Sequence, residues 1–539
     1  MAFYSLHAYD ADAYIPGFLG LKQQDILMNP DTRFAAEAEN VETPNGVLQP
    51  RAANRVLGGS FEGQRIETLA QFHRRWFTGT GSKDWLIAAV GGKLYYRQSG
   101  VDMWSTAIPM PTGIDSFQSN VWSWVTYEIN PDDGDTVDVL LISNQLDGMF
   151  MVIPPDMQNP WSNVKTHDWD YQKAMTWEEV VSPAWAIQPV DTRVDPDDED
   201  EDPPKFGVIE RYAERIWGGN IAGFPDKLIY SRPYDPTDWR PDADVPEDGG
   251  GEINQPSWDG DSFTALKAFG DQLLAFKRNR IWRILGTNPG EYEFREQFGS
   301  GTPYAKTIAK DGERLYMMER DGLAIYDGQN TAPYQRENIE KFWRTVNRNA
   351  MDQMCCAMFR NKYYLALPVN GSAVNNAMLI YDLREGTILL HTGIYVEDFL
   401  PTEDMLYATT SDLPGRLTEV RYDSWVTGAA CGKAAKWTSP WMDFGRKDMQ
   451  KGGFDLYIVP EVQSQPVTLT ISVQTEKKTK TKEYTISPVV GTGKEHRGKK
   501  LHFGGTGRKF RVIIQAPEGN TAPWRLIGGI HMIVETDPD

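Results

Sequence analysis

Short strand-like runs joined by tight turns recur along this chain, and their pattern limits the folds open to it more than any other feature. The clearest unit is Ser262–Gly286. It holds the apolar run Phe263–Phe269, a turn at Gly270-Asp271, a second apolar run at Leu273–Phe276, and then Ile281–Ile284, where apolar and charged residues alternate. Alternation with a period of two is typical of a half-buried strand. The unit therefore predicts an antiparallel meander.

The same pattern returns at intervals over residues 61–430. The second strands of the units are expected to begin near Trp85, Val137, Arg215, Gln272, Arg314, Lys362 and Met405. Most of these intervals are near the roughly 40 to 50 residues of a propeller blade. The 18 tryptophans and 23 tyrosines also favour sheets over helices. We therefore expect an all-β chain whose central part is a β-propeller of about seven blades.

One interval, from Val137 to Arg215, is much longer than the others. It contains the acidic, proline-bounded run Asp195–Pro204, which predicts a surface insertion near residues 155–205. Clustered carboxylates there and at Asp132–Asp135 suit a hard cation such as calcium. Neither run has the closing glutamate of a 12-residue calcium loop. A solvated turn is the interpretation that we favour for both.

Residues 1–60 lack periodic apolar patterning and are rich in turn formers. They predict an extended N-terminal arm with a short helix at Arg33–Glu39. Such an arm buries too little apolar surface to fold alone. Because Phe18, Leu21 and Ile26 favour burial, we expect the arm to lie on its own chain or on a neighbour.

The last region, residues 431–539, differs in both pattern and charge. Strand-like runs separated by lysine-rich turns predict an antiparallel β-sandwich domain. The region holds 17 Lys and Arg against 11 Asp and Glu, a net charge of +6. Residues 1–430 hold 38 against 64, a net charge of −26. An acidic body therefore carries a basic C-terminal domain, and a protein that coats nucleic acid through its whole surface is excluded.

The sequence offers no arrangement of residues that indicates catalysis, a cofactor or a bound metal. A phosphate-binding loop, a nucleophile elbow, a zinc-protease motif and paired-cysteine zinc spacing are all missing from the sequence. The seven histidines are scattered, and the three cysteines are best explained as buried free thiols. The first residues lack a signal-peptide pattern, and no apolar run is long enough to span a bilayer. We expect a non-enzymatic protein that is made in a reducing cytoplasm.

Two basic clusters are candidate contact sites. The first, Lys277, Arg278 and Arg280, occupies the second turn of the Ser262–Gly286 unit and could contact DNA or a neighbouring subunit. The second lies in the C-terminal region and includes Lys477, Lys478, Lys480, Lys482, Lys499 and Lys500. Lysine-rich hairpins also protect sheet edges from aggregation, so edge protection is an alternative to contact with nucleic acid or an acidic partner.

Several sequence segments together resemble the β-propeller tail proteins of tailed bacteriophages. They are Ala38–Arg51, Leu228–Trp239, Leu274–Ile284, Asp321–Gly328 and the C-terminal region that opens at Trp437. These segments follow the order found in that family and together cover most of the chain. Each segment alone is also compatible with an ordinary propeller.

The resemblance implies a structural protein of the virion tail, the nozzle of a short tail. In such a nozzle six copies form a ring around the DNA exit channel, below the adaptor or portal-side protein and above distal tail or fibre proteins. DNA would pass through the ring without sequence-specific binding. Some nozzles carry larger platform insertions than this chain does, which leaves a related connector or tail-tip role open.

A different function is also compatible with the composition. Exposed aromatic side chains stack on sugars, so a propeller that binds or cleaves glycans of the host envelope is the main alternative. The sialidase-type repeat S-x-D-x-G-x-x-W does not occur, although Ser257–Gly260 matches part of it. A cellular propeller scaffold is a third interpretation.

Overall fold

The computed structural model is built almost entirely from antiparallel β-sheets. It describes residues 9–23, 31–73, 84–98, 101–129, 137–154, 185–195, 202–254, 260–298, 301–443, 449–488 and 498–537. The α-helices among them, α2 (Glu340–Trp343) and α3 (Ser424–Thr427), have four residues each. Within these ranges no helix is long and apolar enough to cross a membrane.

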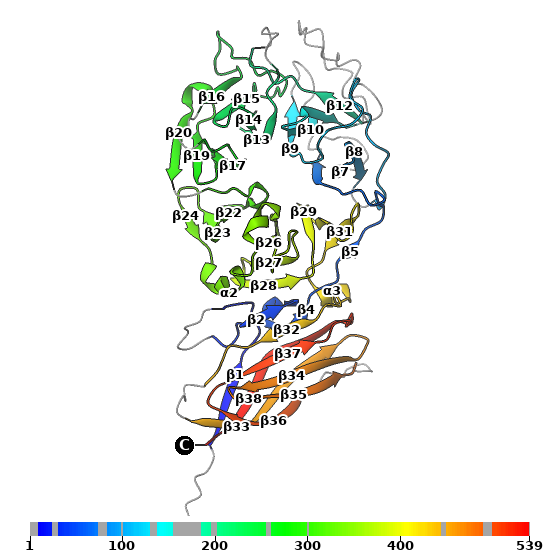
Figure 1. Ribbon diagram of the computed structural model, residues 1–539, viewed down its shortest axis with the longest axis vertical. Coiled ribbons are helices and arrows are strands. Elements are labelled where there is room, and N and C mark those ends of the chain that lie inside the picture. The colour runs from blue at the N-terminus through cyan, green and yellow to red at the C-terminus, as the bar shows by residue number, and fades with distance from the viewer. Residues whose placement is uncertain are drawn as a thin grey trace, which may run out of the picture.

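Successive antiparallel meanders form the upper body in Figure 1. The first has three strands, β6 (Thr68–His73), β7 (Asp84–Val90) and β8 (Lys93–Gln98). The next three have four strands each: β9 (Ser123–Ile129), β10 (Val137–Asn144), β11 (Gly148–Ile153) and β12 (Ala186–Pro189); β13 (Phe206–Tyr212), β14 (Arg215–Ile221), β15 (Lys227–Tyr230) and β16 (Gly251–Asn254); β17 (Ala265–Phe269), β18 (Gln272–Phe276), β19 (Arg280–Leu285) and β20 (Glu293–Phe298).

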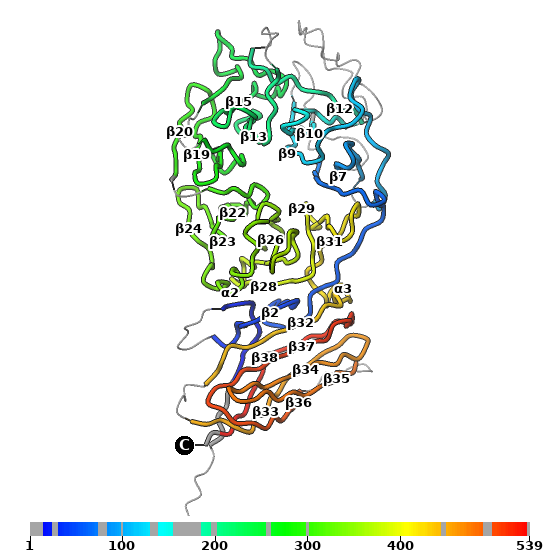
Figure 2. Tube along the Cα trace, viewed as in Figure 1, coloured from blue at the N-terminus to red at the C-terminus, as the bar shows by residue number. Residues whose placement is uncertain are grey.

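The chain continues through three further meanders. They are β21 (Ala309–Asp311), β22 (Arg314–Glu319), β23 (Gly322–Tyr326) and β24 (Thr331–Pro333); β25 (Cys355–Phe359), β26 (Lys362–Leu367), β27 (Ala377–Asp382) and β28 (Thr387–Thr392); β29 (Val396–Pro401), β30 (Leu406–Thr410) and β31 (Leu417–Val420). The first strands of most neighbouring meanders contact one another, the meanders that begin at β17 and β21 share an apolar core, and β29 returns to β6, so the path closes on itself. Figure 2 shows this circular path. The predicted β-propeller is therefore confirmed.

Apolar side chains fill the space between neighbouring blades. Leu274 and Phe276 of β18, for example, are buried together with Leu315 of β22 and Tyr326 of β23. The meander predicted at Ser262–Gly286 is present as β17, β18 and β19, with Gly270 at positive φ in its first turn. A left-handed conformation at this position favours glycine.

The structure describes only part of the range predicted as an insertion, residues 155–205. Strand β12 lies inside that range and completes its blade by pairing with β11, from Phe150↔Pro189 to Ile153↔Ala186. The sequence pattern did not reveal this strand because it has only four residues, too few to show a regular alternation. Residues 155–184 and 196–201, which include most of the acidic run, lie outside the described residues.

A strand from the N-terminal segment completes the last blade. Strand β5 (Arg55–Val56) pairs with β31 through Thr418↔Val56 and Glu419↔Arg55. The outer strand of this blade therefore comes from residues that precede the first blade in sequence. This pairing joins the two ends of the propeller, and it places residues 55 and 56 in a blade rather than in the predicted arm.

Below the propeller, two sheets enclose a common core, which we call the C-terminal sandwich. One sheet has the order β1 (Tyr9–Ile15), β38 (Trp524–Asp537), β33 (Gln450–Val462) and β36 (Lys499–Gly507). The other contains β2 (Glu37–Glu39), β32 (Ala435–Thr438), β37 (Phe510–Ala516), β34 (Val467–Thr475) and β35 (Thr479–Ile486). Leu456 and Met532 of the first sheet and Ile471 and Ile514 of the second are buried in the same core.

Strand β2 makes the propeller and the sandwich parts of one nine-stranded sheet. It pairs in parallel with blade strand β28 and antiparallel with β32. The side chain of Asn40 adds hydrogen bonds to both sides: its amide group donates to Ala434 O at 3.0 Å, and its Oδ1 accepts from Thr392 N at 2.9 Å. Hydrogen-bonded strands fix both spacing and direction, so the two parts are joined without a flexible linker.

The other described parts of the N-terminal segment also lie on their own chain. Strand β1 pairs with β38 from Tyr9↔Thr536 to Ile15↔Ile530. Phe18 packs edge-on against Trp437, with ring centroids 5.0 Å apart. The helix predicted at Arg33–Glu39 is wrong, because Glu37–Glu39 form β2 and their pairing with β32 and β28 overrides the local preference.

A buried carboxyl group lies close to this junction. Glu42 belongs to β3 (Val41–Glu42), which pairs with β4 (Gln49–Pro50). Gln49 Nε2 donates to Glu42 Oε2 at 3.4 Å and to Asp423 Oδ1 at 3.0 Å. Burial raises the pKa of Glu42 to about 8, although Lys362 opposes the shift. Glu42 is therefore mostly protonated at neutral pH in the folded protein.

The raised pKa makes a prediction about stability. In the unfolded chain Glu42 ionises at its ordinary pKa, so its contribution to folding is fully present below about pH 4.5 and is lost as the pH rises through about 8. We compare the free energy of unfolding of Glu42→Gln with that of the wild type at each pH. This difference should shift in favour of the variant by roughly 3 kcal/mol from about pH 5 to about pH 8.5. Denaturant titrations at both pH values measure this. The exposed Glu403→Gln should show no such change, and an equal response of both variants would contradict the assignment.

Candidate functional site

The first predicted cluster lies in the turn between β18 and β19, but its three cations have different environments. Lys277 is fully buried; its ammonium group pairs with Asp226 and lies 4.6 Å from the centre of the Phe263 ring. Arg280 pairs with Glu296 at 2.5 Å, from the neighbouring strand β20. Arg278 is 54% exposed, and among the described residues it forms one long ion pair, with Asp261 at 3.9 Å. The prediction of Lys277 as a contact residue is therefore wrong, and Arg278 is the side chain that projects from the turn.

The second predicted cluster is brought together by the sandwich. Lys477 and Lys478 lie just before β35, Lys480 and Lys482 lie on β35, and Lys499 and Lys500 begin β36; all six are exposed. Strand β36 is an edge strand of the first sheet, and β35 is an edge strand of the nine-stranded sheet. These two edge strands contact each other, because Lys482 lies 5.7 Å from the Phe503 ring and Lys499 lies 5.8 Å from the Tyr484 ring. We call this surface the lysine edge.

The register of β35 explains part of this arrangement. Lys480 is opposite Val473 and Lys482 is opposite Ile471, so both lysines are on the face of the sheet that carries the buried core residues. An inward-facing lysine on an edge strand prevents another strand from adding to the sheet. Edge protection, the alternative to partner contact, therefore has direct structural support for these two residues.

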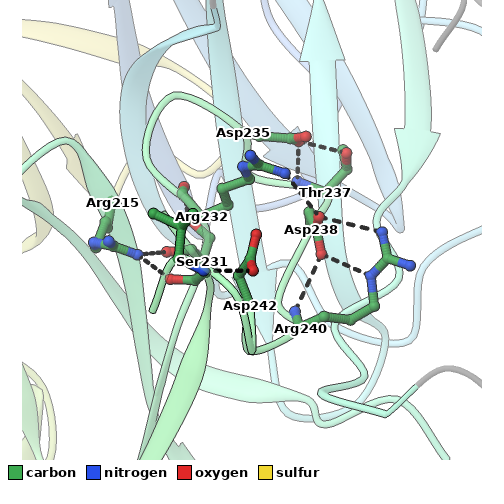
Figure 3. Close-up of polar contacts among 10 residues, drawn as sticks. Arg215, Ser231, Arg232, Asp235, Thr237, Asp238, Arg240 and Asp242 are labelled. Carbon is green, nitrogen blue, oxygen red and sulfur yellow. Dashed lines mark hydrogen bonds and ion pairs between the residues drawn. The ribbon is translucent and has the colours of Figure 1, made fainter. Parts of the chain in front are cut away.

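A long loop between β15 and β16 is held by a buried arginine, and Figure 3 shows its polar contacts. Arg215 on β14 is almost completely buried. Its Nη1 donates to Ser231 O at 2.9 Å and to Gly249 O at 2.5 Å, and its Nη2 donates to Glu247 O. One guanidinium group thus connects the beginning and the end of the loop. Three carbonyl groups therefore share one side chain as their donor.

The interior of the loop contains further charge-assisted contacts. Asp238 Oδ1 accepts from Arg240 N at 3.1 Å and from Arg240 Nε at 3.0 Å, and Arg232 lies 3.8 Å from its other oxygen. Asp235 Oδ1 accepts from both the backbone and the hydroxyl of Thr237. The loop is therefore fixed by its own side chains (Figure 3). No local sequence pattern indicates the role of Arg215, which follows a turn and looks like an ordinary strand residue.

Charged side chains also lie on the innermost strands of the propeller. Glu210 of β13 pairs with Lys267 of β17 at 3.2 Å. Asp398 of β29 lies 3.9 Å from Lys306, and burial raises the pKa of Asp398 while Lys306 lowers it. Each of these carboxylates faces a lysine. Among the described residues no group of three or more His, Cys, Asp and Glu side chains is placed to hold a metal ion.

No family model matches the chain, and no curated protein matches it in sequence. Among solved structures, it is similar to the computationally designed Ika8 protein, with 10% identity, 68% of this chain and 100% of that chain covered, and a TM-score of 0.37. It is also similar to the WD40 domain of Neurospora crassa Pan2, with 10% identity, 69% and 97% coverage and a TM-score of 0.35. The AfRom2 CNH domain has 7% identity, 69% and 99% coverage and a TM-score of 0.33. Similarities at this level concern the fold alone.

The role of Arg215 can be tested by hydrogen exchange. We expect Arg215→Met to leave the carbonyl groups of Ser231, Glu247 and Gly249 without their donor and to increase amide exchange across residues 231–250 by about ten-fold or more. Exchange in the sandwich strands β33 and β38 is the internal control. Arg215→Lys keeps the charge but lacks the forked geometry, so it should protect the loop only in part. Unchanged exchange in the methionine variant would show that the loop does not depend on Arg215.

Proposed function

We propose that this chain is a structural subunit of a bacteriophage tail, a nozzle in which several copies, six by the resemblance, form a ring around the DNA exit channel. The ring would join an adaptor or portal-side protein to distal tail or fibre proteins. The observation that carries this proposal is the nine-stranded sheet shared by the propeller and the sandwich. Because the propeller and the sandwich are joined without a flexible linker, the subunit can keep a fixed shape while DNA passes through the ring.

The charge distribution supports the same role. The net charge of −26 on residues 1–430 repels a DNA duplex, so a passage lined by this part would let DNA slide without binding it. The lysine edge is the basic feature of the opposite end of the chain. We propose that it contacts an acidic tail component next to the nozzle.

We also propose that the propeller has seven blades. This number counts the three-stranded meander β6–β8 as one blade and the meander β29–β31, completed by β5, as the last. The other five blades are the four-stranded meanders described above.

Mass photometry of the purified full chain tests the proposed assembly. We expect particles at a fixed multiple of the monomer mass, and a ring in negative-stain images. Because ring and DNA carry the same sign of charge, we also expect no tight binding of duplex DNA at about 150 mM salt. A chain that stays monomeric at all concentrations, both alone and with the portal-side protein, would contradict the proposal.

One observation favours a second candidate function, the binding of glycans. Tyr14 of β1, His531 of β38, Tyr457 of β33 and Lys500 of β36 are register partners in one row across the outer face of their sheet. The Tyr457 and His531 rings are stacked with centroids 5.5 Å apart, and Tyr14 is 53% exposed with its hydroxyl fixed to Gly528 O at 2.6 Å. A fixed row of one exposed ring and two half-buried rings offers a surface on which sugars can stack.

A glycan array with bacterial surface polysaccharides tests this second candidate. Binding that is lost about ten-fold or more in Tyr14→Ala and Tyr457→Ala would support it. Trp441→Ala, which removes an exposed aromatic side chain outside the row, is the matched control. The absence of binding to every glycan on the array would remove this candidate.

A further inference from the structure

Three neighbouring turns of the propeller are linked to one another by side-chain contacts. Each joins the second and third strands of its blade: Asn144–Gly148 between β10 and β11, Ile221–Lys227 between β14 and β15, and Lys277–Arg280 between β18 and β19. Second-to-third turns lie at the same end of every blade, because the strands of the meanders are antiparallel. The exposed side chains of these turns include the large apolar residues Leu146 (54%) and Phe224 (55%) and the cation Arg278 (54%). We call these three residues the turn surface.

Contacts between the turns hold this surface together. Gln145 Nε2 donates to Asn220 Oδ1 at 3.1 Å, which ties the first turn to the strand that leads into the second. Lys277 pairs with Asp226, which ties the third turn to the second. The buried Lys277 is therefore a positioning residue for the turn that carries Arg278. A surface whose turns are fixed in this way loses little conformational entropy when it binds a partner.

The residue types on the turn surface are those of a protein interface. Aromatic residues and arginine are enriched where protein surfaces bind each other. Lys227 lies 4.9 Å from the centre of the Phe224 ring and supports it. Lys205, also exposed, donates to Leu146 O at 2.8 Å. Two exposed apolar tips beside exposed cations suit a partner that is itself apolar and acidic.

The opposite face of the same blade presents such a partner. The Ile221–Lys227 turn precedes β15, whereas the loop fixed by Arg215 follows it, so the two lie at opposite ends of this strand. Residues 241–248 of that loop, which we call the acidic loop, carry Asp242, Asp244, Glu247 and Asp248. Val245, at 45% exposure, is an apolar tip among these carboxylates. Arg215 holds the end of the loop in place through Glu247 O and Gly249 O.

We infer that the turn surface of one copy binds the acidic loop of the next copy. The inference rests on the proposed ring. A contact between two different faces of the same chain is heterologous, and heterologous contacts close into rings when the rotation between copies permits it. Charge complementarity between Arg278 and Lys205 on one face and four carboxylates on the other specifies the second copy as the occupant.

Duplex DNA is the less favoured occupant of the turn surface. DNA binding depends on several lysines and arginines that neutralise phosphates. Here one projecting arginine and the exposed Lys205 lie beside two apolar tips, and Lys277 is buried against Asp226. This composition favours a protein.

Charge exchange tests the inference. We expect Arg278→Glu and the double variant Asp244→Arg/Glu247→Arg each to weaken ring formation by about ten-fold or more in mass photometry. Combining all three substitutions should restore part of the assembly, because the charges are then reversed on both faces. Phe224→Ala should weaken the ring without any change of charge. Val426→Ser, at another exposed apolar position on α3, is the control and should leave the ring intact.

The outcomes separate this inference from the proposed function. If the wild type forms rings and every variant does so equally well, the turn surface is not the contact, and the proposed function stands. If the wild type forms no ring with or without the portal-side protein, both fail. If Arg278→Glu leaves the ring intact but abolishes binding of a labelled DNA duplex, measured by fluorescence anisotropy, the occupant is DNA and the inference is overturned.

Discussion

The backbone pairing of one short strand joins the two parts of this molecule. Strand β2 contributes Glu39 to a parallel bridge with Leu390 of β28 and three residues to an antiparallel ladder with β32. Because strands in a sheet share fixed spacing and direction, this pairing sets how the acidic propeller and the basic sandwich lie relative to each other. The positions of the lysine edge, the acidic loop and the turn surface on one body all depend on it.

The N-terminal segment makes this arrangement cooperative. Its strands β1, β2 and β5 enter the sandwich, the junction and the last blade in turn. Their partners are hundreds of residues away in the sequence, as in Tyr9↔Thr536 and Thr418↔Val56. Neither the propeller nor the sandwich has all its strands until this segment is in place. Non-local pairings of this kind make folding slow, but they give the folded chain few places at which to open.

The meanders could be predicted from the sequence, whereas contacts between residues far apart in the sequence could not. Alternating apolar residues and turn glycines such as Gly270 are local signals, and they located the meander at β17–β19. Strands β5 and β12 are too short for such a signal. Lys277 looked exposed because it lies at a turn, but Asp226 of the preceding blade pairs with it and Phe263, from the start of the same meander, packs against it. The role of Arg215 likewise appears only when residues 247–249 fold back onto it.

The central claim is that this chain is a ring-forming part of a virion tail. Cryo-electron microscopy of intact tailed virions that contain the protein tests it most directly. The account predicts copies of the chain in a ring coaxial with the DNA channel, each with the propeller and sandwich in the relative orientation set by β2. Copies placed only on fibres away from the channel axis, or particles that lack the protein altogether, would contradict it.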